Sequence, residues 1–281
     1  MQENLSKKYC PKLIEDNMFG LKRRKREHIR NLPFPEKWQE ILEKNISYYH
    51  HLNSEDQAEL RGHIQIFLSE KTFEGLDGLV ITDEIKVTIA AQACILLLHR
   101  ETDYYPTLYT ILVYPHPFYS NIKQNLPGRI IEEGNQGRLG ESWNRGPVIL
   151  SWDDVSRSAH DHNDVHNVVF HEFAHQLDGE SGAADGAPVL SGRSSYIAWA
   201  RVLSEEYQDL LDHLKHHHKS DIDSYGATNA AEFFAVVTEY FFEKPIQLKK
   251  RHPELYEQFK DFYKLDTESI MLKRDGKNNN E

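Results

Sequence analysis

His171, Glu172 and His175 are the residues whose types and spacing indicate chemistry most clearly, because they form an H-E-x-x-H motif. On a helix, residues four positions apart share one face, so both imidazoles can reach one metal ion. Zinc binds histidine nitrogens at about 2.0–2.1 Å and suits such a pair. Glu172 then lies beside the ion, where it can accept a proton from a water held there. The apolar residues around the motif predict the buried helix that this geometry requires.

A catalytic zinc site needs a third protein ligand and one open position. The strongest candidate is Glu232, because its predicted helix is almost wholly apolar and a buried carboxylate needs a partner or a metal. Asp178, three residues after His175, suits a hydrogen bond to an imidazole N–H better than direct ligation. Weaker candidates are two loop acids and four histidines in a polar stretch that we expect to face solvent: Glu180, Asp185, His213, His216, His217 and His218.

Two further residues are singled out by their spacing from Glu232. Glu239 lies seven residues later on nearly the same helix face, where it either orients a histidine or caps the exposed end. Tyr225 lies seven residues earlier in a turn-like segment, and its hydroxyl can donate to a developing oxyanion. The longer metzincin motif is excluded, because it needs a glycine and a histidine where this sequence has Asp178 and Ser181.

The elements that must position these residues predict an α+β fold that is mainly helical, with a small mixed sheet. Helical patterns come first, strand patterns follow, and helices return from about residue 163. The predicted strands are Leu108–Tyr114, Gly128–Glu133 and Pro147–Trp152. The last of these precedes the motif helix, and we expect it to be a sheet edge on which an extended peptide lies as an added strand.

Composition predicts one large folded unit with two flanking segments. With 39% hydrophobic and 27% charged residues, the chain fits a globular protein. We divide it into a basic N-terminal arm at residues 1–32, a single domain at residues 33–268 and a disordered tail at residues 269–281. Within the domain, residues 33–100 form a helical part and residues 101–268 a catalytic part.

Charge and cysteine content exclude several classes of protein. The net charge of −11 makes general binding of nucleic acid or anionic membranes unfavourable. Contact with nucleic acid through the basic run Lys22–Arg26 stays an alternative, but a solvated arm is the favoured interpretation of this run. Cys10 and Cys94 are too few for a disulfide scaffold or a four-thiolate zinc site. The polar N-terminus and the lack of a long apolar segment predict a cytoplasmic protein without a membrane span.

Three segments together resemble the Mlc titration factor A family: Gly140–Trp152, Asn163–Asp178 and Ile222–Pro245. The resemblance covers about residues 35–263. It implies a bacterial cytosolic zinc metallopeptidase with a zincin-like fold, related to the catalytic domain of anthrax lethal factor. It also implies aminopeptidase-like activity on a peptide or protein substrate.

Carried over residue by residue, the resemblance implies that His171, His175 and Glu232 bind one zinc ion. It further implies that Glu172 is the general base and that Tyr225 assists the transition state. The lethal-factor helix has an acidic residue four positions after its glutamate ligand, where this sequence has Val236.

The same resemblance implies a second kind of function, the binding of the transcriptional repressor Mlc. In that alternative the chain is a non-catalytic regulator that titrates a repressor, and the peptidase site is secondary. Direct binding of nucleic acid through Lys22–Arg26 is the weakest of the three readings.

Overall fold

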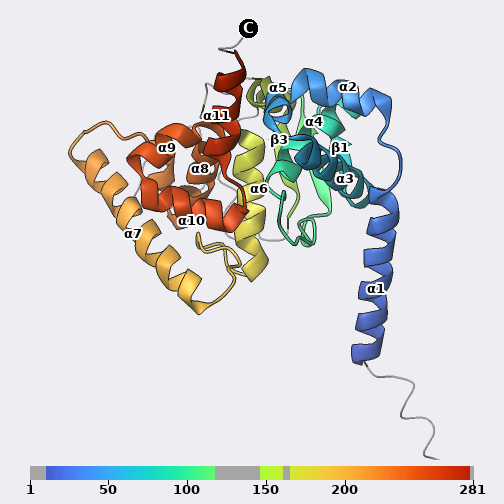
Figure 1. The fold of residues 1–281 in the computed structure, drawn as a ribbon, viewed down its shortest axis with the longest axis horizontal. Helices are drawn as coiled ribbons and strands as arrows, with labels where there is room; N and C mark the ends of the chain where they lie inside the picture. Colours follow the sequence, from blue (N-terminus) through green and yellow to red (C-terminus); the bar gives the residue numbers. More distant parts are fainter. Residues whose placement is uncertain (1–10, 118–145, 161–164, 279–281) are drawn as a thin grey trace, which may run out of the picture.

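The computed structural model describes residues 11–117, 146–160 and 165–278 (Figure 1). The strand predicted at residues 128–133 lies outside these ranges. The first helices are α1 (Pro11–Arg30), α2 (Glu36–Asn45), η1 (Ser47–His51), α3 (Ser54–Glu70), α4 (Asp83–Ile95) and α5 (Trp152–His160). The later helices are α6 (Val168–Asp178), η2 (Gly179–Ser181), α7 (Arg193–Lys215), η3 (Ser224–Ala227), α8 (Ala230–Glu243), α9 (Pro245–Arg251), α10 (Pro253–Tyr263) and α11 (Thr267–Asn278).

The described strands form one small sheet in the order β1 (Thr72–Gly75), β2 (Thr110–Tyr114) and β3 (Val148–Ser151). Both strand pairs are parallel, so the prediction of a mixed sheet is wrong for the described residues. For β1 and β2 the reason lies in the connection, because α4 lies between them and a helical crossover returns the chain to the same end of the sheet. In this sheet β3 is an edge strand.

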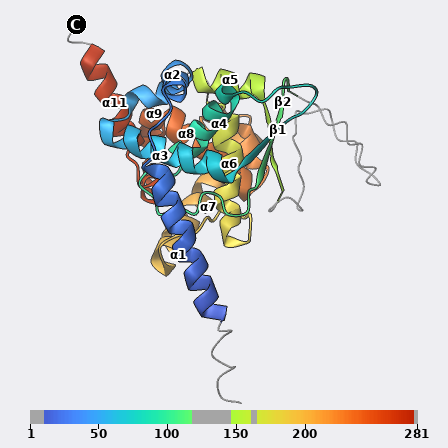
Figure 2. The same ribbon diagram turned by 90° about the vertical axis from the view of Figure 1, so that its right-hand side faces the viewer.

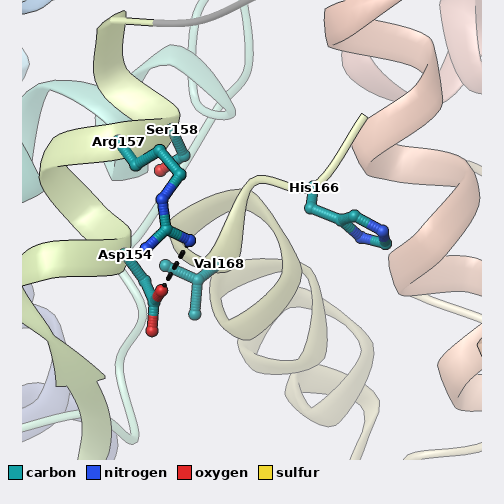
Figure 3. A pocket seen from close by; sticks show the side chains of 5 residues that line it. All are labelled: Asp154, Arg157, Ser158, His166 and Val168. Carbon is teal, nitrogen blue, oxygen red and sulfur yellow. Dashed lines mark hydrogen bonds and ion pairs between the residues drawn. The ribbon is translucent and has the colours of Figure 1, made fainter. Parts of the chain in front are cut away.

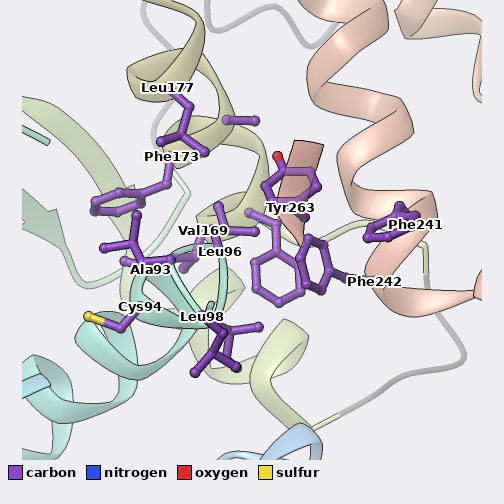
Figure 4. Close-up of a cluster of buried hydrophobic side chains, with 14 of the residues drawn as sticks. Ala93, Cys94, Leu96, Leu98, Val169, Phe173, Leu177, Phe241, Phe242 and Tyr263 are labelled. Carbon is purple, nitrogen blue, oxygen red and sulfur yellow. The ribbon is translucent and has the colours of Figure 1, made fainter. Parts of the chain in front are cut away.

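Helix α6 lies at the centre of the molecule, between the sheet side and the group formed by α7 to α10 (Figure 1). It packs against α8 on one side and against α4 on the other. Figure 4 shows side chains of these helices and of α10 meeting in one buried cluster. In it the rings of Phe173 and Tyr105 are 4.8 Å apart and those of Phe170 and Phe242 are 5.0 Å apart. This packing fixes the helix that carries the motif.

Cys94 lies within this core, and burial raises the pKa of its thiol well above the ordinary value. A buried thiol of this kind behaves as a small hydrophobic side chain, so Cys94 packs in the core rather than reacts.

The two ends of the described chain are helical. Helix α1 extends away from the body in both views (Figures 1 and 2), and Arg26 near its end pairs with Glu70 and Asp103. Helix α11 occupies a segment for which composition predicted disorder. It is held because Lys249 pairs with Glu268, and Ile270 packs against the core. The division at residues 32 and 268 stays a prediction. No helix among the described residues is long and apolar enough to cross a membrane.

Candidate metal centre

An asparagine caps each of the two helices that form the centre. The side chain of Asn167 accepts a hydrogen bond from the Phe170 N–H at 3.0 Å and begins α6. The side chain of Asn229 accepts one from the Glu232 N–H at 3.0 Å and begins α8. These caps fix where each helix starts, and therefore the direction in which the side chains of the first turns point.

The side chains of His171, His175 and Glu232 meet between α6 and α8. Oε2 of Glu232 is 3.0 Å from Nε2 of His171 and 3.3 Å from Nε2 of His175. The two Nε2 atoms are themselves 3.2 Å apart. These three residues offer ligand atoms close enough together to hold one metal ion. Their side chains are 14–24% exposed, so the meeting point is accessible from solvent.

Charge at the meeting point favours a cation. Burial alone would lower the pKa of His171, but hydrogen bonds to Glu232 and Glu239 outweigh it and raise the pKa to about 10. Burial alone would raise the pKa of Glu232, yet its bonds to both histidines lower the pKa to about 2. The carboxylates thus stabilise positive charge at this point, whether a proton or a metal ion carries it.

Glu239 orients His171 from the other side of the ring. The Nδ1–H of His171 donates to Oε1 of Glu239 at 2.7 Å, which directs Nε2 toward Glu232. The second oxygen of Glu239 accepts the backbone N–H of Asn167 at 2.6 Å. Of the two roles predicted for Glu239, the structure therefore shows the first. Val236, at the position where the lethal-factor helix has an acidic residue, is buried. In this chain the carboxylate that contacts His171 belongs to Glu239, about one turn further along α8.

A buried polar network that the sequence analysis missed supports Glu239. The side-chain amide of Asn167 donates to Glu243 at 2.9 Å and to Gln92 of α4 at 3.1 Å. All four residues are buried, so each hydrogen bond is made away from competing water. In the sequence, the only local indication of this network is that two polar residues, Gln92 and Glu243, stand in otherwise apolar helices.

Tyr225 lies beside His171, with 5.8 Å between the ring centroids. Its backbone N–H donates to Oδ1 of Asp223 at 2.7 Å, and Oδ2 of Asp223 is 3.6 Å from Nε2 of His166. Asp223 therefore links η3 to the segment that enters α6. A cavity of about 100 Å³ is lined by His166, by Val168 and by the Asp154–Arg157 ion pair of α5. Figure 3 shows Val168 beside the ion pair and His166 farther away.

Glu172 is a half-buried neighbour of the ligand histidines. Burial raises the pKa of its carboxyl group, although His171 and His175 act in the opposite direction. Its carboxylate makes no hydrogen bond or ion pair with another residue that the structure describes, so its oxygens can accept a proton.

From its spacing, Asp178 was expected to accept a hydrogen bond from an imidazole N–H. The structure shows a different partner. Asp178 is fully buried, and its Oδ2 accepts the backbone N–H of Gly186 at 2.9 Å. The helix directs it toward the following loop, where it fixes that turn. Glu180 and Asp185 are also outside the group of possible ligands around His171.

The expectation that the four histidines at and beyond the C-terminal end of α7 face solvent holds for His216, His217 and His218, which are exposed. His213 differs, because it is half-buried and lines a cavity.

A second group of possible metal ligands, Asp56, Glu59 and His99, has a different character. Nε2 of His99 is 2.7 Å from Oδ1 of Asp56, and its backbone N–H donates to Glu59 at 3.0 Å. Each of these contacts is an ordinary hydrogen bond between a donor of His99 and a carboxylate acceptor, so none of them needs a metal ion. Around Glu232, by contrast, two imidazole nitrogens converge on one oxygen and on each other. We therefore interpret the second group as an ion-paired clasp between α3 and the segment that follows α4.

The chain is similar over most of its length to several known proteins. A protein of Synechocystis sp. that has no assigned function is 44% identical over 235 residues, which cover 83% of this chain and 86% of that protein. Mlc titration factor A of Klebsiella pneumoniae is 32% identical over 232 residues, with 82% and 86% covered. Mlc titration factor A of Yersinia pestis is 30% identical over 234 residues, with 82% and 84% covered.

A family model described as glucose-regulated metallo-peptidase M90 matches residues 21–264. That span includes both helices of the centre and the segment that carries Tyr225. Membership of this family implies a metal ion, and the cluster of His171, His175 and Glu232 offers the ligands for one. The chain belongs to the glucose-regulated metallo-peptidase M90 family.

Proposed function

We propose that this chain is a zinc-dependent peptidase with aminopeptidase-like activity and a zincin-like catalytic fold. The observation that carries the proposal is the convergence of His171, His175 and Glu232 within 3.3 Å. These two imidazoles and one carboxylate would supply the three protein ligands of a catalytic zinc ion, which in such sites keeps a further position for water or substrate.

The surrounding residues have matching roles in this proposal. Zinc, when bound, supplies Lewis-acid activation of a water and of a peptide carbonyl. Glu172 takes the proton from the attacking water and passes it to the leaving amine. Tyr225 donates its hydroxyl hydrogen to the developing oxyanion. Glu239 is a positioning residue, because it acts through His171.

The peptide is proposed to lie along β3 as an added strand. Among the described strands β3 is at the sheet edge, and it leads directly into α5, near α6. Ile149→Pro removes a backbone donor from this edge and should reduce peptide turnover, whereas Ile149→Val should not. Unchanged turnover in the proline variant would remove this part of the proposal.

Metal content and turnover, measured together, test the main proposal. Elemental analysis should find zinc in the wild type and much less in His175→Ala and Glu232→Ala. Glu172→Gln should keep the zinc and lose turnover of aminopeptidase substrates. Equal zinc content in wild type and His175→Ala would contradict the ligand assignment, and an active Glu172→Gln would contradict the mechanism.

A second function is favoured by the relatives named Mlc titration factor A. In it, the chain binds a transcriptional repressor of the Mlc type, and binding does not depend on hydrolysis. Capture of purified repressor by Glu172→Gln as well as by wild type would support this binding role. No capture by either protein would rule it out.

A further inference from the structure

The short helix η3 carries Tyr225 beside the centre, with 5.8 Å between the ring centroids of Tyr225 and His171 and 41° between the ring planes. A 3₁₀ helix of about one turn closes few hydrogen bonds of its own. The direction in which Tyr225 points therefore depends on the residue that begins η3 and on the groups that hold it from outside.

Asp223 begins η3 and holds the backbone on both sides of Tyr225. Its Oδ1 atom accepts the backbone N–H of Tyr225 at 2.7 Å, and its carbonyl oxygen accepts the N–H of Gly226 at 3.1 Å. An amide hydrogen bond to a charged carboxylate is stronger than one to a neutral oxygen. Both peptide groups that flank Tyr225 are bonded to Asp223, so this one residue fixes the direction of the Cα–Cβ bond of the tyrosine.

Other contacts hold the C-terminal half of η3. Tyr207 of α7 donates its hydroxyl hydrogen to the backbone carbonyl of Ala227 at 3.1 Å. A Cβ atom placed on Gly226 would lie 3.5 Å from Cβ of Val236, so η3 lies directly against α8 at this point. These contacts follow Tyr225 in the chain, whereas Asp223 anchors the chain before it.

The second oxygen of Asp223 faces the segment that enters α6. Its distance of 3.6 Å from Nε2 of His166 is longer than a direct hydrogen bond. The side chains of Asp223 and His166 are 36% and 66% exposed, so water screens this pair. The next residue, Asn167, donates its backbone N–H to Glu239 at 2.6 Å. Two adjacent residues thus meet the carboxylate that orients a ligand histidine and the carboxylate that holds Tyr225.

We propose that Asp223 is the positioning residue for Tyr225 and acts through its bonds to the two flanking peptide groups. This inference rests on the proposed function, in which Tyr225 donates its hydroxyl hydrogen to an oxyanion. A fixed donor stabilises that charge without reorienting, and a displacement of about 1 Å can cost about 100-fold in rate. His166 contributes less, because its contact with Asp223 is longer and screened.

Hydrogen exchange at the Tyr225 amide tests the positioning without metal or substrate. The metal-free, full-length chain is measured by mass spectrometry with fragmentation that isolates this amide. Asp223→Ala should exchange several-fold faster than wild type, whereas Asp223→Asn keeps an oxygen acceptor and should stay close to wild type. Asp221→Ala is the matched control, because Asp221 is an exposed acid two positions earlier and pairs with Arg251 instead.

A double-mutant cycle on turnover shows whether Asp223 acts through Tyr225. At unchanged zinc content, Tyr225→Phe should lower kcat by roughly 100-fold or more, and Asp223→Ala by roughly 10–100-fold. The double variant should be no slower than Tyr225→Phe alone, because misplacing the ring has no further effect once its hydroxyl group is absent. Asp223→Asn should retain most of the wild-type turnover, and His166→Gln should lose less than Asp223→Ala.

Three outcomes would overturn the proposal. Exchange at the Tyr225 amide that is equal in Asp223→Ala and wild type would show that the carboxylate does not hold this residue. Turnover losses that multiply in the double variant would show that Asp223 acts by another route. Asp223→Asn as slow as Asp223→Ala would show that the charge, and not the bond to the amide, is needed.

Failure of the proposed function gives a different result. A wild type that binds zinc but has no peptidase activity would remove that function, and the exchange measurement would still decide whether Asp223 anchors Tyr225. If circular dichroism shows that Asp223→Ala is unfolded, Asp223→Glu replaces it in both experiments. Its longer side chain keeps the charge and moves the carboxylate away from the amide.

Discussion

At the scale of single residues, the centre is defined by how His171 is held. Both ring nitrogens have a carboxylate partner, Glu239 at Nδ1 and Glu232 at Nε2. The ring can therefore neither flip nor rotate without losing a charge-assisted hydrogen bond. His175 has a less restricted ring, because the described residues offer it hydrogen-bond partners at Nε2 and none at Nδ1.

Glu239→Gln should weaken zinc binding by about 10–100-fold while the protein remains folded. The amide retains one oxygen but removes the charge that holds the His171 Nδ1–H. Competition with a zinc chelator of known affinity measures the change. Glu243→Gln is the matched control on the same helix, because Glu243 accepts the side-chain amide of Asn167, whereas Glu239 holds the Nδ1–H of His171. An equal loss in both variants would contradict the orienting role of Glu239.

At the scale of elements, the loop between α6 and α7 sets the position of α8. Gly186 has a φ of 78°, and a Cβ atom placed there would lie 2.4 Å from the carbonyl oxygen of Ala230. Asp178 binds the backbone N–H of this glycine, and the indole of Trp199 binds its carbonyl oxygen. The turn is therefore packed tightly against the first residue of α8, two positions before Glu232.

Gly186→Ala should destabilise the protein by more than about 2 kcal/mol, since it combines backbone strain with a clash against backbone atoms. It should also weaken zinc binding by displacing the start of α8. Gly182→Ala is the control, because Gly182 has a φ of 90° in the same loop but no neighbour within 4 Å of the added atom. Thermal unfolding compares the two. A smaller loss for Gly186→Ala than for Gly182→Ala would refute the packing argument.

The clasp formed by His99 should stabilise the protein in a pH-dependent way. Burial alone would lower the pKa of His99, but the hydrogen bond to Asp56 and the charges of Asp56 and Glu59 raise it. A raised pKa means that the folded state binds the proton more tightly than the unfolded state does. The contribution is thus complete below the unfolded pKa of about 6.5 and disappears as the pH rises through the folded value.

His99→Asn removes the charge and keeps a residue that tolerates the φ of 60° at this position. Its loss of unfolding free energy, at most about 1 kcal/mol, should be largest below pH 6.5 and should shrink at higher pH. Denaturant titrations at several pH values measure this. His217→Asn is the control, because His217 has a φ of 55° and no ion pair with any described residue. A loss for His99→Asn that does not vary with pH would contradict the clasp.

Local patterns predicted the helices and the residues that meet between them. His171 and His175 are four apart on a helix, and Glu232 is an acid in an apolar helix, so each signal lies within a few neighbouring residues. The network from Gln92 through Asn167 to Glu243 had no such signal, since its members are 75 or more positions apart. The parallel direction of the strands was not predicted, because it depends on the crossover connections. The partner of Asp178 was not predicted either, because its distance from His175 in the sequence does not show which group its side chain faces.

At the scale of the whole molecule, the basic N-terminal segment is part of the fold at Arg26. Its guanidinium makes two parallel bonds to Glu70, at 2.7 and 2.8 Å, and a third to Asp103 at 2.6 Å. It also lies 4.6 Å from the ring centroid of Tyr104. The charge of Arg26 is therefore paired within the protein. One positive charge of the basic run Lys22–Arg26 is thus not free to bind a nucleic-acid phosphate.

Arg26→Lys should lower the free energy of unfolding by about 1–2 kcal/mol, because an ammonium group cannot make the paired bonds of a guanidinium. Arg24→Lys provides the comparison, since Arg24 is exposed and makes no ion pair with a described residue. Denaturant unfolding monitored by circular dichroism gives both values. Equal stability of the two variants would show that α1 is not held through Arg26.

The placement of Trp199 has a practical consequence. Its indole is buried, stacks on Phe259 at 5.3 Å and donates its N–H to the carbonyl of Gly186, the glycine packed against the start of α8. A shift of that turn changes both the polarity around the indole and its hydrogen bond. In a variant whose other three tryptophans, Trp38, Trp143 and Trp152, are replaced by phenylalanine, the fluorescence of this one ring gives an optical signal for events at the neighbouring acid ligand, readable in real time in a stopped-flow instrument.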